Sequence, residues 1–138
     1  MKLWLLLIAL SFKGIVMAQD SWKVKLNGKE VLISSVENED KNSIALSSAD
    51  LKKKKNFNVT YLEKNKAKDW ERFIVAVGEN DELIKKKGNT FIISNAALQH
   101  LFNKSGSIKF YTWALPLDPK KRAAVRVRRV HLCTLVLK

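Results

Sequence analysis

The sequence predicts an all-β protein, an antiparallel β-sandwich of immunoglobulin-like or cupredoxin-like layout with one or two short helical turns. Three observations predict it. Apolar and polar residues alternate in short runs, most clearly over residues 22–26. Turn-forming residues separate these runs about every 10 residues. No long stretch repeats its apolar residues with the 3.6-residue period of a helix, which argues against an all-α or α/β fold.

The first elements form a predicted hairpin. Asn27-Gly28 follows the alternating run at 22–26, and both residue types tolerate the positive φ of a two-residue hairpin turn. Residues 30–36 are therefore expected to return as the second strand, followed by a polar, acidic loop. Further strands are expected at 43–46, 57–62, 70–77, 82–85, 90–93 and 108–115, with helical turns over 96–102 and a loop over 116–121.

Residues 124–137 are predicted to form the last and longest strand. Its apolar residues change parity over 128–130, and a one-residue slip turns every side chain to the other face. A single β-bulge there would restore the pattern and place His131 and Cys133 on one face with the arginines. Alternatively, both faces of the strand are buried beyond Val130.

Two segments of the chain, 42–52 and 89–99, align with each other, and Asn, Ser, Ala and Leu coincide at four of eleven positions. Each is typical of a strand, a Ser or Asn cap and a helical turn closed by an inward Leu. Immunoglobulin-like sandwiches cross between their sheets at such corners. Duplication and convergence on one stable corner both explain the likeness.

Residues 1–18 are predicted to be a cleaved export signal, followed by one domain over 19–138. Lys2 supplies a positive charge, and the apolar run at 3–12 is too short for a transmembrane helix, which needs about 20 residues. With one Cys, the chain lacks the paired cysteines common in small secreted eukaryotic domains. We therefore expect a periplasmic, outer-surface or secreted protein of a Gram-negative bacterium, without a transmembrane span after cleavage.

The chain is strongly basic, with 26 Lys+Arg, 13 Asp+Glu and a net charge of +13. Residues 19–138 retain +11, because the predicted signal holds two lysines and no acid. The cations gather at 52–55, 85–87 and 120–129. This balance favours contact with polyanions. Alternatively, lysines on turns and strand edges serve solubility and prevent edge-to-edge aggregation.

The sequence therefore predicts a non-enzymatic binding module for an anionic polysaccharide, lipopolysaccharide or an envelope protein. Nucleic acid is not an expected partner, because single-strand binding needs aromatic residues on the basic face. Only Tyr111 and Trp113 qualify for that role, whereas Trp22, Trp70 and Phe73 are interpreted as core. Alternatively, the stretch that contains Trp113 has no binding role, and Pro116 and Pro119 fix the loop that follows it as a connection between the sheets. The candidate ligand-binding residues are Lys120, Arg122, Arg126, Arg128 and Arg129, with Trp113 as a stacking group.

Two other classes of function stay open, although no cofactor is expected. His131 and Cys133 stand at i and i+2, point the same way on a regular strand and, with His100, would form a copper site of cupredoxin type. A hydrolase would need two carboxylates on either side of the bond, and the acids lie in loops. The sequence holds no G-x-S-x-G motif, P-loop or dinucleotide fingerprint.

The stretch Tyr111-Thr-Trp-Ala-Leu-Pro-Leu-Asp-Pro119, followed by Val125-Arg-Val-Arg-Arg-Val-His-Leu-Cys133, resembles small exported β-sandwich proteins of Bacteroidetes-type bacteria. The likeness is close over the last quarter of the chain and loose elsewhere. It implies an envelope protein of such a bacterium. It brings no activity and no site residues.

Overall fold

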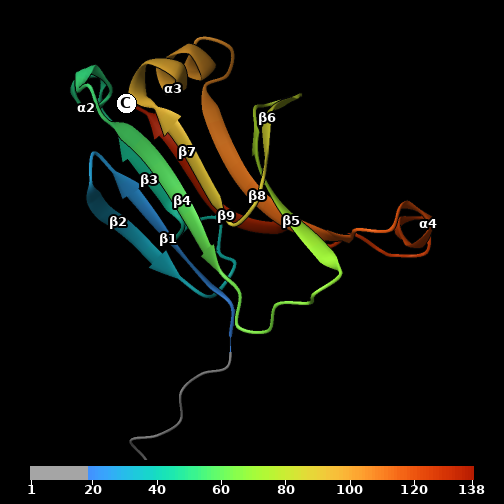
Figure 1. Cartoon of the computed structure of the whole chain (residues 1–138). Coiled ribbons are helices and arrows are strands. Elements are labelled where there is room, and N and C mark those ends of the chain that lie inside the picture. The colour runs from blue at the N-terminus through green and yellow to red at the C-terminus, as the bar shows by residue number, and fades with distance from the viewer. Residues whose placement is uncertain (1–18) are drawn as a thin grey trace, which may run out of the picture.

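A computed structural model describes residues 19–138, so the predicted export signal at 1–18 lies outside the described residues. Strands make up 50% and helices 14% of the structure, which confirms the all-β class. Two sheets pack together: sheet A has the order β2-β1-β4-β7, and sheet B has the order β3-β9-β8-β5-β6 (Figure 1). The strands are β1 Ser21–Leu26, β2 Lys29–Ser34, β3 Ser43–Leu46, β4 Asn56–Leu62, β5 Trp70–Val77, β6 Glu82–Lys87, β7 Thr90–Ser94, β8 Ser107–Pro116 and β9 Val130–Leu137, and the helices are α2 Ser48–Lys52, α3 Asn95–Phe102 and α4 Pro119–Arg122.

The predicted hairpin joins β1 and β2. Asn27 and Gly28 form its turn with φ values of 55° and 81°, the left-handed conformations that this dipeptide tolerates. Across residues 19–138, all neighbouring strands pair antiparallel except β3 and β9, which pair parallel. Sheet B is therefore mixed rather than purely antiparallel. The reason is the α2 corner, which takes the chain from β3 into sheet A and leaves β3 at the edge beside the last strand.

The two aligned segments form matching corners, as predicted. Each helix begins after a serine N-cap, Ser47 before α2 and Ser94 before α3, whose Oγ accepts a backbone N–H three residues on. Leu51 and Leu98 close the corners by burial in the core. The α2 corner leads from sheet B to sheet A, and the α3 corner leads back from sheet A to sheet B.

The end of the chain differs from the prediction. The last strand, β9, begins at Val130 rather than at 124, and β8 is the longest strand, with 10 residues. Asp118 caps the short helix α4 inside the predicted loop, and residues 123–129 form a mostly exposed connection. Its arginines alternate with apolar residues as in a strand, but burying them unpaired would be costly. Beyond Val130 both faces of β9 are buried, which was one of the two alternatives.

The core lies between the sheets and beneath the two corners. Phe110 of sheet B packs against Phe57 and Phe91 of sheet A, with ring centroids 5.1 and 5.2 Å apart. The indole N–H of Trp22 donates to the carbonyl of Leu132 over 2.8 Å and ties the sheets together. None of the helices in residues 19–138 has the length and apolar composition of a transmembrane helix.

Candidate functional site

The outward side chains of β5, β6, β8 and β9 form a surface that we call the outer face of sheet B. Phe73 pairs with Trp113 in the register of β5 and β8, and Val75 pairs with both Tyr111 and Lys85. Directly opposed residues share one face of a sheet. The middle of this face is therefore aromatic, and lysines of β6 border it.

Two cations lie over Trp113 on this face. The Nζ atom of Lys85 is 5.5 Å from the indole centroid and 4.5 Å from the ring of Phe73. The guanidinium carbon of Arg129 approaches the same indole to 4.7 Å. Both distances are within the range of cation–π attraction, which holds a cation without neutralising it. Among the ion pairs of residues 19–138, none includes Lys85 or Arg129, so two unneutralised positive charges converge on one ring.

The other predicted cations are placed differently. Arg122 donates to Glu71 over 2.5 Å and to the carbonyl of Pro116, and Arg128 pairs with Glu37 at 2.8 Å. Lys120 and Arg126 are exposed, on α4 and in the connection that follows it. Of the six candidate ligand-binding residues, the structure brings Trp113 and Arg129 into contact. The structure also places Lys85 over Trp113. The sequence showed Lys85 as part of the lysine run at 85–87 but did not show that it lies beside Trp113.

Trp113 itself is only 6% exposed, because it packs beside Phe73 beneath the two cations. Little of its ring is left for a ligand to stack on. Trp113 instead holds Lys85 and Arg129 over its ring by cation–π attraction.

The two residues of the predicted copper pair lie on opposite faces of sheet B. His131 pairs with Tyr111, and Cys133 pairs with Phe110, so one extra residue of β9 bulges between adjacent positions of β8. Cys133 therefore points into the core, where burial raises the pKa of its thiol, whereas His131 points outward. The expectation that i and i+2 point the same way fails at this bulge, which lies beyond the predicted 128–130. His100 is exposed on the helix α3.

His131 is buried at the edge of the outer face. Its Nε2 lies 2.8 Å from the hydroxyl of Thr134, its ring meets Tyr111 edge-on at 5.5 Å, and its backbone N–H donates to Glu37. Its Nδ1 has no hydrogen-bond partner in residues 19–138. Burial lowers the pKa of the imidazole, and the nearby carboxylates of Glu37 and Glu39 oppose that shift. No group of three or more His, Cys, Asp and Glu in the described part of the chain is placed to share a metal ion.

A groove adjoins the outer face where β5 begins. It consists of two hollows of about 370 and 460 Å³, and both are lined by Trp70 and Leu117. Figure 1 shows this end of β5 and the connection to α4 projecting beyond sheet A. Trp70 is 38% exposed, so the interpretation of this residue as core was wrong, whereas Trp22 is buried as predicted. The reason is that sheet A does not cover the first residue of β5.

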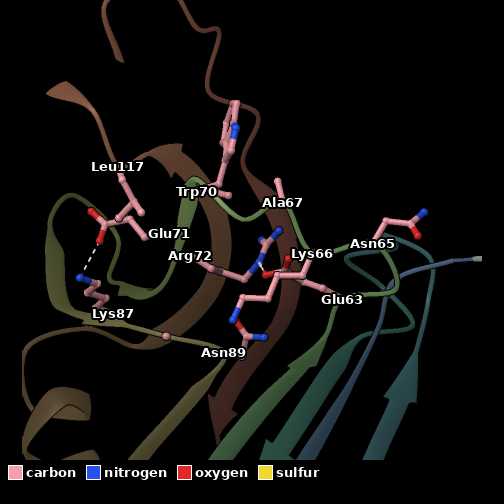
Figure 2. Close-up of a pocket in the computed structure, with 12 residues that line it drawn as sticks. Glu63, Asn65, Lys66, Ala67, Trp70, Glu71, Arg72, Lys87, Asn89 and Leu117 are labelled. Carbon is pink, nitrogen blue, oxygen red and sulfur yellow. Dashed lines mark hydrogen bonds and ion pairs between the residues drawn. The ribbon is translucent and has the colours of Figure 1, made fainter. Parts of the chain in front are cut away.

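The first hollow of the groove is lined by two carboxylates, Glu63 and Glu71, and both are held by cations (Figure 2). Glu63 pairs with Arg72 at 2.5 Å. Glu71 pairs with Lys87 at 2.7 Å and with Arg122, and these partners lower the pKa of its carboxyl. A glycosidase needs one carboxyl with a raised pKa as its acid. The cations around Glu71 lower the pKa of its carboxyl, so Glu71 does not suit the role of that acid.

The chain matches no model of a known protein family, and no curated protein matches it.

Proposed function

We propose that the protein is a non-enzymatic binding module that holds an anionic polymer on the outer face of sheet B. The observation that carries this proposal is the pair of cations on Trp113. Lys85 lies on β6 and Arg129 just before β9, on the two sides of β8, and both lie over one indole without a carboxylate partner among residues 19–138. A sulfate, phosphate or carboxylate group placed between them would gain two charge-assisted contacts.

The surroundings of this pair support an extended ligand. Lys87 and Lys109 lie on the same face, each with one acidic partner, Glu71 and Glu39. The net charge of +11 on residues 19–138 adds long-range attraction for a polyanion. A polymer gains more from this arrangement than a small anion does, because each further phosphate or sulfate releases counterions.

The non-enzymatic part of the proposal rests on the carboxylates of the first hollow. Glu63 and Glu71 are each paired with cations, and the lowered pKa of Glu71 suits a charged structural group rather than a proton donor. The predicted export signal and the resemblance to exported bacterial proteins favour a place in the cell envelope. Acidic polysaccharide and lipopolysaccharide are the polyanions available there, and both are proposed as ligands.

Heparin chromatography in a salt gradient tests the proposal. Lys85→Ala/Arg129→Ala should elute at clearly lower salt than the wild type. Lys52→Ala/Lys54→Ala is the matched control, because it removes the same charge from exposed lysines at α2 and should elute close to the wild type. Equal shifts of the two variants would show that only net charge matters. Wild-type retention no stronger than that of a basic control protein would also overturn the proposal. Lipopolysaccharide micelles as a second matrix would separate the two ligand sources.

A further inference from the structure

The groove around Trp70 has an exposed aromatic ring and two hollows, and the proposed anion site uses neither. Trp70 lines both hollows and is the most exposed tryptophan in residues 19–138. Figure 2 shows the ring standing clear of the strand, in the view between Leu117 and Ala67. An exposed flat ring that borders two hollows fits a chain of units better than one isolated molecule.

The walls of the groove offer both donors and acceptors of hydrogen bonds. The amides of Asn65 and Asn89 line the first hollow, and neither side chain has a hydrogen-bond partner in residues 19–138. Asp118 and Lys121 line the second hollow. An amide supplies two N–H donors and one acceptor, which suits a ligand that carries many hydroxyl groups.

The floor of the groove is held in place before any ligand arrives. The backbone N–H of Gly88 donates to the backbone carbonyl of Arg72 over 2.8 Å, and that of Leu117 donates to the backbone carbonyl of Asp69 over 2.7 Å. The guanidinium of Arg72 is fixed by Glu63 and by the hydroxyl of Thr112. A site built on fixed strands loses little conformational freedom on binding.

We propose that this groove binds an uncharged oligosaccharide chain, with one sugar ring stacked on Trp70 and its neighbours in the two hollows. A pyranose ring presents an apolar C–H face to an aromatic ring and hydroxyl groups at its rim. Trp70 provides the apolar surface, and the amides of Asn65 and Asn89 line the first hollow, where they can meet the hydroxyl groups of a neighbouring unit of the chain. A purely hydrophobic ligand would leave these amides without partners, which is unfavourable once water is displaced. This site is distinct from the pair of cations on Trp113, because neither Lys85 nor Arg129 lines the groove, although Lys87 borders both.

An array of uncharged oligosaccharides of glucose, galactose, mannose and N-acetylglucosamine tests the inference with the full chain. The wild type should bind at least one series, and the binding should persist at high salt because no ion pair is involved. Trp70→Ala should lose about tenfold in affinity, and Trp70→Phe should retain most of it. Asn65→Ala/Asn89→Ala should also weaken binding. Leu62→Ala is the matched control, because it removes an exposed apolar side chain on β4, outside the groove.

Two results would overturn the inference. One is a wild type that binds no uncharged oligosaccharide on the array. The other is a Trp70→Ala variant that binds as the wild type does. Trp70→Ala should lose no more than a few degrees in its thermal midpoint, and its heparin elution should match that of the wild type. Failure of glycan binding with intact heparin binding therefore removes this site and leaves the anion site standing.

Discussion

Two tryptophans on sheet B have opposite surroundings. Trp113, in the middle of β8, is 6% exposed and carries Lys85 and Arg129 over its ring, whereas Trp70, the first residue of β5, is 38% exposed. Position in the sheet makes the difference. In the centre, long cationic side chains from both sides of β8 reach over the indole of Trp113, whereas no cation of residues 19–138 lies over the ring of Trp70.

The comparison shows how one residue type can serve two kinds of surface. At Trp113 the aromatic ring holds two charged groups that face solvent and is itself almost fully buried. At Trp70 the ring is itself the accessible surface. Replacing each tryptophan should therefore produce different losses, in stability at one position and in binding at the other.

Trp113→Ala should have the largest effect on stability. Truncating a buried tryptophan removes its packing against Phe73, and such changes cost about 3–5 kcal/mol. Trp70→Ala should cost less than about 1 kcal/mol, because much of the side chain already contacts water. Urea unfolding of both variants measures this difference. Equal losses would remove the contrast between the two regions.

Arg129→Ala should lower the affinity for a sulfated polymer by about tenfold, because it removes one of the two unneutralised cations. Arg128→Ala is the neighbouring control and should lower the affinity far less, since its guanidinium is already paired with Glu37. Calorimetric titration with heparin oligosaccharides measures both. A stronger loss in Arg128→Ala than in Arg129→Ala would contradict the assignment of the site.

Stability should fall as the pH drops below about 6.5, the ordinary pKa of histidine. Burial lowers the pKa of His131, so the unfolded chain takes up a proton that the folded chain refuses. The stabilising contribution is therefore present above the unfolded pKa and is lost as the pH falls through the folded pKa. Urea midpoints from pH 7.5 to 5 check the slope. His131→Gln should flatten it, and His100→Gln, an exposed control, should leave it unchanged.

Glu71→Gln should have the smallest effect on the affinity for a sulfated polymer, and it should raise the affinity rather than lower it. Glu71 neutralises Lys87 and Arg122 where the outer face meets the groove. Its removal should free both cations and raise the affinity for a sulfated polymer by about twofold. The same titration measures it. A fall in affinity would mean that the two cations need Glu71 to hold their positions.

Much of the fold was predictable because its strands alternate in sequence. The predicted strands at 43–46 and 70–77 match β3 and β5, and the aligned corners form as expected. The last strand was extended too far, since the arginines before Val130 alternate like strand residues but remain in solvent. The parallel pairing of β3 with β9 depends on contacts between distant parts of the chain, which local patterns do not record.

The candidate site was predictable only in part. Trp113 and Arg129 were both named because they lie in the aromatic and arginine-rich stretch near the end of the chain. Their partner Lys85 depends on the register of β5 with β6, which the sequence does not state. Trp70 opens the most apolar strand, and hydropathy alone cannot tell that the strand projects past sheet A. The prediction that His131 and Cys133 share one face was wrong, because the bulge in β9 places the two side chains on opposite faces of sheet B.

The most direct test of the anion site is a ¹H–¹⁵N spectrum recorded during titration with a heparin tetrasaccharide. The indole N–H of Trp113 and the guanidinium Nε–H of Arg129 should shift together, in proportion to the fraction bound. The indole of Trp22, buried between the sheets, should stay unchanged. Shifts confined to residues 52–55, with Trp113 and Arg129 unmoved, would contradict the account.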